Sequence, residues 1–126
     1  MSATHPETDP SFSIDVEPER DVVRVCPSGE VDMATAGEIR ARIDELVERG
    51  FTRVALDLRG VTFLDSTGVR LVLELTAEAS ADGWDLAVVK GPEPVCRVFE
   101  ITGVEPLVPF VEPAQARSLS SGSAWR

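Results

Sequence analysis

The sequence contains few of the residue types on which small enzymes and secreted scaffolds depend. Its 126 residues include two cysteines, one histidine and no tyrosine. Cys26 and Cys96 lack the close spacing of metal sites and small disulfide frameworks, so we expect both to be buried free thiols. The single histidine, His5, lies in a polar N-terminal stretch, which leaves no imidazole base for a Ser-His catalytic pair. These absences predict a protein that is not an enzyme and that holds no cofactor and no metal.

Long apolar runs and a leader sequence are missing as well. No apolar run approaches the roughly 20 residues that span a bilayer. The N-terminus has neither the basic start nor the apolar centre of a secretory signal. We therefore expect a cytoplasmic protein that does not insert into a membrane.

Positive charge is scarce. Lys and Arg number 12 against 22 Asp and Glu, which gives a formal net charge of 12 − 22 = −10. Such a chain repels the phosphates of nucleic acids and the head groups of anionic lipids. We therefore expect no direct binding to nucleic acid, and we expect protein partners with basic surfaces.

The length and the composition of the two ends predict one domain with two tails. A chain of this size forms a single ordinary core. Residues 1–11 carry prolines among polar neighbours and residues 117–126 are rich in serine, so we expect both segments to be disordered around a domain at 12–116. Whether a last helix opens at Pro113 stays undecided, because the serine-rich end leaves it little length.

Hydrophobic periodicity predicts alternating strands and helices. Residues 12–16 and 22–26 alternate apolar and polar side chains around a charged turn, which indicates a hairpin. Residues 35–48 carry an apolar stripe of helical period, and Thr35 three residues before Glu38 has the spacing of a capping box. The apolar run at 54–58 predicts a buried parallel strand reached by a crossover.

The second half repeats this alternation. A helix is predicted at 66–81, and it is apolar around more of its circumference than one core face requires, so it is either deeply buried or partly exposed for a partner. A strand at 84–89 and a helix at 92–102 follow, and Pro109 suggests an edge strand at 107–111. The order predicts an α/β domain whose mostly parallel sheet is covered by helices.

One junction between a strand and a helix stands out as a candidate site. Residues 64–69 read Leu-Asp-Ser-Thr-Gly-Val, and the carboxyl ends of strands are where α/β sheets usually carry sites. Asp65 or Ser66 could simply cap the helix. Alternatively, Ser66 could stand exposed as a phosphate acceptor near the helix N-terminus. A hydrolase nucleophile elbow does not fit, because Leu64 stands where Gly is needed.

A second polar cluster precedes the first helix. Residues 29–32 read Gly-Glu-Val-Asp. The cluster is either a turn with a charged rim or a pair of carboxylates for a metal, but no third ligand is evident.

These two segments together resemble the STAS family of anti-sigma factor antagonists. The resemblance covers about residues 12–111, and it includes Gly91-Pro92 and the segment 101–104, Ile-Thr-Gly-Val. It implies the STAS fold, a four-to-five-stranded, mostly parallel sheet with an N-terminal hairpin and helices largely on one face. It also implies a partner switch with Ser66 as the phosphorylation site and Thr67 as a lesser alternative. The residues implied in partner binding are Glu30, Asp32, Asp65, Thr67, Gly68 and Val69.

The implied cycle involves two proteins besides the sigma factor. The unphosphorylated chain binds an anti-sigma factor with serine kinase activity and so frees a sigma factor, phosphorylation of Ser66 ends that complex, and a phosphoserine phosphatase resets it. The alternative is a STAS regulatory subunit of a membrane transporter or ABC-type lipid exporter, which would dock through the same helix without phosphorylation. The matching acceptor segment favours the partner switch.

Overall fold

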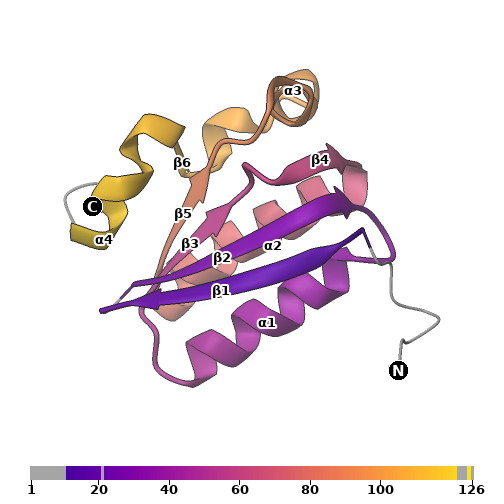
Figure 1. Cartoon of the computed structure of the whole chain (residues 1–126). Coiled ribbons are helices and arrows are strands. Elements are labelled where there is room, and N and C mark those ends of the chain that lie inside the picture. Colours follow the sequence, from indigo (N-terminus) through magenta and orange to yellow (C-terminus); the bar gives the residue numbers. More distant parts are fainter. Residues whose placement is uncertain (1–10, 21, 122–124, 126) are drawn as a thin grey trace, which may run out of the picture.

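The computed structural model describes residues 11–20, 22–121 and 125, and six strands form one mixed sheet in this part of the chain. The strands are β1 (Ser13–Glu19), β2 (Val22–Val31), β3 (Arg53–Asp57), β4 (Val61–Leu64), β5 (Asp85–Val89) and β6 (Phe110–Val111). Their order is β1-β2-β3-β5-β6, and β4 pairs with β2 (Figure 1). Only the β1–β2 hairpin is antiparallel, which confirms the predicted mostly parallel sheet with an N-terminal hairpin.

The first half of β2 pairs with β3, and its last residues pair with β4. The sequence analysis did not predict β4, because it has four residues and the two in its middle, Thr62 and Phe63, are exposed. The other strands and helices were predicted with small differences at their ends. β6 is the predicted edge strand, and it begins directly after Pro109.

Three of the four helices follow the predicted pattern. The helices are α1 (Ala36–Glu48), α2 (Ser66–Asp82), α3 (Glu93–Ile101) and α4 (Ala116–Ser121), and two short 3-10 turns lie at Glu105–Leu107 and Pro113–Gln115. α1 and α2 lie side by side behind the sheet in Figure 1. The apolar stripe of α1 is buried at Ile39, Ile43 and Leu46. These side chains and the apolar face of α2 pack on alternate residues of the central strands to form the main core.

The wide apolar surface of α2 is explained by deep burial. Leu71 and Leu75, which fall outside its single predicted stripe, are both buried in the main core. Helix α2 therefore packs on the sheet and on α1 at once. The alternative, in which these leucines are exposed for a partner, is wrong.

Arg40 ties α1 to α2 along their outer side. Its guanidinium donates hydrogen bonds to Glu78 at 2.6 Å and Glu74 at 3.1 Å on α2, and to Asp44 on its own helix at 3.4 Å. The hydrogen bond that Arg40 donates to Glu78 is the main cause that raises the pKa of Arg40 above its already high ordinary value. One cation is thus shared among three carboxylates.

The opposite face of the sheet is partly covered by α4. Leu119 and Ala116 pack on Ala55, Ala87 and Val89, which point away from the main core. The structure thus differs from the prediction of a disordered tail from Arg117 on, since the helix continues to Ser121 and Leu119 is fully buried. The sequence signal was weak because only one large apolar side chain anchors this helix. The tail predicted at 1–11, apart from Ser11, lies outside the described residues.

Both cysteines are free thiols, as predicted, and both are partly buried. Burial, and then the negative charge of Asp57, raises the pKa of Cys26 to about 11. Burial also raises the pKa of Cys96. Both thiols are therefore protonated at neutral pH and are poor nucleophiles.

We predict that Leu119→Ala releases α4 from the sheet. Removing a buried leucine side chain from a core costs about 2 to 5 kcal/mol, and the lower end applies here because a short peripheral helix can detach. The free energy of unfolding, measured in urea, should fall by about 2 kcal/mol, and trypsin should cleave after Arg117 much faster. Leu107→Ala, which truncates an exposed side chain, is the control and should change neither measurement.

Candidate functional site

Parallel pairing of β4 with the end of β2 brings the two polar segments together. Val31 lies opposite Leu64 in the ladder, and Glu30 lies opposite Phe63. The N–H of Asp65 donates to the carbonyl of Val31 at 3.2 Å. Two segments that are more than thirty residues apart in the sequence thus end side by side at one edge.

Gly29 makes the bend that starts the first segment. Its φ is +109°, in the region that favours glycine, and a Cβ there would press on the carbonyl oxygen of Ser11. Its N–H donates to the carbonyl of Gly60 at 3.0 Å. A side chain at this position would displace both the bend and the strand end that follows it.

Thr35 holds the rest of this segment, in a way that the sequence analysis did not foresee. Its buried hydroxyl accepts a hydrogen bond from the N–H of Asp32 at 3.0 Å and donates to the carbonyl of Glu30 at 2.8 Å. The predicted capping box with Glu38 is wrong, because Thr35 makes no side-chain cap on α1. The hydroxyl turns back toward the strand end instead of forward to the helix. Glu30 is exposed and Asp32 is half-buried.

Asp65 caps α2 and leaves Ser66 without that task. Its Oδ1 accepts hydrogen bonds from the N–H groups of Thr67 at 2.9 Å and Gly68 at 3.2 Å. The sequence left open whether Asp65 or Ser66 caps the helix, and the structure shows that Asp65 does. Ser66 is the first residue of α2, its side chain is exposed, and its hydroxyl makes no hydrogen bond with another described residue.

The capping bonds also change the expected surroundings of a phosphate on Ser66. Two of the backbone donors at the start of α2 are already occupied by Asp65, so the helix end offers fewer free N–H groups than the sequence suggested. The helix dipole still favours negative charge at this end. A phosphate on the exposed hydroxyl would therefore extend toward solvent instead of being drawn into the loop.

Gly68 and Val69, which the resemblance implies in partner binding, are both buried in this structure. A Cβ on Gly68 would collide with the side chain of Leu64 and crowd that of Val31, so α2 approaches the two strand ends closely only because residue 68 is glycine. The Val69 side chain is buried. Both residues pack on the core side of the loop that carries Asp65 and Ser66. Thr67 is half-buried, and its hydroxyl is therefore less accessible than that of Ser66.

A hollow of about 450 Å³ adjoins the acceptor and contains a residue that the sequence analysis missed. It is lined by Asp32, Met33, Ala34 and Asp65. Among the large apolar side chains that the structure describes, Met33 is the most exposed, at 83%, and Phe63 on the neighbouring strand is 50% exposed. The detectable signal was a methionine directly after the acidic segment, at a turn position where polar residues are usual.

Membrane-spanning helices and metal-binding clusters are both absent from the described residues. None of the helices described is long and apolar enough to cross a membrane. In the same part of the chain, no group of three or more His, Cys, Asp or Glu side chains is placed to hold a metal ion.

Fold and site together define a small α/β domain in which an exposed hydroxyl stands at the first residue of a helix, beside a neighbouring strand end. The family model described as "Mlab, STAS domain" matches residues 12–109. An anti-sigma F factor antagonist of Paenibacillus polymyxa is 28% identical over 103 residues, which are 81% of this chain and 88% of that protein.

Two solved structures of SpoIIAA share the fold. The anti-sigma factor antagonist SpoIIAA in its unphosphorylated form has a TM-score of 0.72 and 24% identity, over 87% of this chain and 96% of that chain. The Bacillus cell fate determinant SpoIIAA in the phosphorylated form has a TM-score of 0.67 and 23% identity, over 87% and 99%. With a family model that matches most of its length, the chain belongs to the STAS domain family.

We predict that Asp65→Ala destabilises the start of α2. Losing an N-cap side chain costs about 1 kcal/mol, and the free energy of unfolding should fall by that amount in urea titrations. Asp65→Asn keeps an acceptor oxygen and should lose less than half as much. Equal losses in the two variants would show that the charge of Asp65, and not its capping geometry, stabilises the helix.

Proposed function

We propose that this chain is an anti-sigma factor antagonist whose binding is switched off by phosphorylation of Ser66. The observation that supports this is the exposed Ser66 hydroxyl, which Asp65 relieves of the capping role. The unphosphorylated chain binds an anti-sigma factor with serine kinase activity and so frees a sigma factor. A phosphoserine phosphatase restores the binding form.

The docking surface that we propose for the unphosphorylated chain surrounds the hollow beside Ser66. It combines an apolar contact, Met33, with carboxylates on its rim, Glu30, Asp32 and Asp65. Apolar anchors inside a charged rim are typical of protein interfaces. A chain with a net charge of −10 would meet a basic surface on the anti-sigma factor fastest.

The proposed phosphate transfer requires only an accessible hydroxyl on this chain, because the kinase supplies the ATP and the base. The Ser66 Oγ attacks the γ-phosphorus of ATP held by the kinase, the bond to the ADP oxygen breaks, and the hydroxyl proton leaves to a base on the kinase. The product carries about −1.5 to −2 charges at neutral pH. Those charges stand beside Asp65, in the wall of the hollow that Asp32 also lines. A partner surface that fits the neutral hydroxyl closely has no room for the phosphate and would have to bury its charge, which costs free energy.

The switch acts on binding and leaves the fold unchanged. Ser66 points to solvent and has no hydrogen bond within the described residues, so the phosphate replaces no internal contact. SpoIIAA, which shares the fold, has this fold in both its unphosphorylated and its phosphorylated form. We therefore expect phosphorylation to raise the dissociation rate of the complex without unfolding α2.

Substitutions at Ser66 test the switch. Ser66→Ala should bind the cognate anti-sigma factor as tightly as the unmodified chain and stay bound in the presence of ATP. Ser66→Asp should bind at least tenfold more weakly, because it places a permanent charge at the acceptor. Both affinities can be measured by calorimetry, and equal affinities would contradict the charge mechanism.

The site of phosphorylation is settled by the intact mass after incubation with that kinase and ATP. One phosphate should be added to the wild-type chain and to Thr67→Val, and none to Ser66→Ala. A phosphate retained in Ser66→Ala would move the acceptor to Thr67. If the chain co-purifies with a transporter ATPase and takes up no phosphate, it is instead a transporter subunit.

Met33 gives a separate test of the docking surface. Met33→Ala removes an exposed side chain and should leave the free energy of unfolding unchanged. We expect the dissociation constant of the anti-sigma complex to rise about five- to thirtyfold, as for a central apolar contact. Leu107→Ala, an exposed apolar truncation outside the hollow, is the matched control and should bind normally. Equal binding by Met33→Ala and the wild-type chain would place the interface elsewhere.

A further inference from the structure

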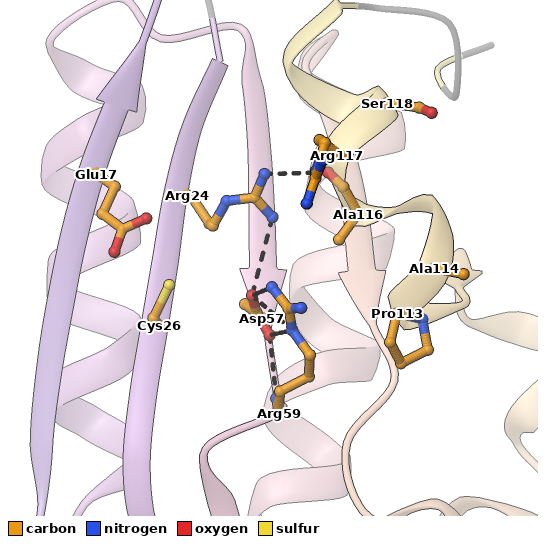
Figure 2. Close-up of a pocket in the computed structure, with 10 residues that line it drawn as sticks. All are labelled: Glu17, Arg24, Cys26, Asp57, Arg59, Pro113, Ala114, Ala116, Arg117 and Ser118. Atoms are coloured by element: carbon orange, nitrogen blue, oxygen red, sulfur yellow. Dashed lines mark hydrogen bonds and ion pairs between the residues drawn. The ribbon is translucent and has the colours of Figure 1, made fainter.

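A second cleft lies on the face of the sheet opposite α1 and α2, between the strands and α4 (Figure 2). Its volume is about 700 Å³. Three arginines line it, Arg24, Arg59 and Arg117, together with two carboxylates, Glu17 and Asp57. The proposed switch at Ser66 uses none of these residues.

Arg24 is a buried cation that its neighbours satisfy only in part. Its side chain is 8% exposed, and Nη2 donates to the carbonyl of Ala116 at 3.0 Å. Nη1 has no hydrogen-bond partner, and the nearest oxygens of Asp57 and Glu19 lie at 3.8 Å from the guanidinium. Asp57 is already occupied, because its two oxygens accept hydrogen bonds from Arg59 at 2.6 to 3.2 Å. A buried charge that lacks close pairing is costly.

Charges of both signs meet at the cleft, and Glu19 beside Arg24 adds a carboxylate to the two in the lining. Burial by itself would raise the pKa of Asp57, but the hydrogen bonds from the Arg59 side chain and backbone, and the charge of Arg24, outweigh it and lower that pKa. Asp57 is therefore ionised at neutral pH. The lining then carries three positive and two negative charges, on a protein whose net charge is −10.

Two of the arginines offer donors at the surface of the cleft. Arg59 is 49% exposed, and its hydrogen bonds to Asp57 use Nε and Nη2, which leaves Nη1 available. Arg117 on α4 is exposed and forms no ion pair with the residues that the structure describes. Figure 2 shows both side chains at the cleft, on opposite walls. Guanidinium groups pair in a fixed geometry with phosphate and carboxylate oxygens.

We propose that this cleft binds a small polar molecule through a phosphate or carboxylate group held between Arg59 and Arg117. The charge of Arg24, which also lines the cleft, adds to the attraction. The volume exceeds that of a single oxyanion and lies in the range of small-molecule sites, so the remainder of the molecule is polar and of metabolite size. Because Arg117 belongs to α4 and Arg59 follows β3, the bound molecule also fastens α4 to the sheet.

Calorimetry with two probes tests the site on the full chain at low ionic strength. Pyrophosphate represents the phosphate source and citrate represents the carboxylate source. We expect one of them to bind at a single site, and the one that binds identifies the chemistry. Arg117→Ala should weaken that binding about tenfold, as for one charge-assisted hydrogen bond. Arg42→Ala removes the same charge from α1 on the other face and should bind as the wild-type chain does.

Protection of α4 gives a second measurement that does not depend on heats of binding. The probe that binds should slow trypsin cleavage after Arg117 in the wild-type chain. It should slow this cleavage by the same factor in Ser66→Ala, because Ser66 is not part of the cleft. The proposal is overturned if neither probe binds at about 10 mM, well above metabolite-range affinities. Equal weakening by Arg117→Ala and Arg42→Ala would also overturn it, because the attraction would then be non-specific.

Discussion

The short parallel ladder between β4 and the end of β2 is the interaction on which the candidate site depends. It places Asp65 beside Val31, through a 3.2 Å hydrogen bond between their backbones. The glycines at 29 and 68 allow this close approach, one by its backbone angle and the other by its missing side chain. Without the ladder, the acidic segment and the acceptor segment would be two unrelated loops.

Asp65 and Ser66 have different roles although they are adjacent in the sequence. Asp65 satisfies the first donors of α2, and Ser66 is left with an exposed hydroxyl. In many helices a serine at this point would itself be the cap. The proposed regulation therefore depends on a carboxylate that performs a structural task next to the residue that is modified.

Much of this could be predicted from the sequence, and the exceptions have physical reasons. Periodicity identified the helices that bury one face, and the two polar segments indicated the family. β4 was missed because a strand of four residues with an exposed centre has no period to detect. The burial of Val69 depends on how closely α2 packs on Leu64, and the part played by Thr35 depends on a hydroxyl turning backward, which are both properties of three-dimensional packing. The cleft beside α4 gathers residues from five separate elements, and no local pattern marks it.

The shared cation at Arg40 has a consequence for how a partner would meet this surface. α1 begins four residues after Asp32 and α2 begins directly after Asp65, so each polar loop is the leading end of one helix. Arg40 bonds both helices laterally through Glu74 and Glu78. The two helices that follow the polar loops are thereby tied to each other, and a protein docking on the loops would lose less free energy in ordering them. Loosening this tie between α1 and α2 would leave the two polar loops less preorganised for a partner.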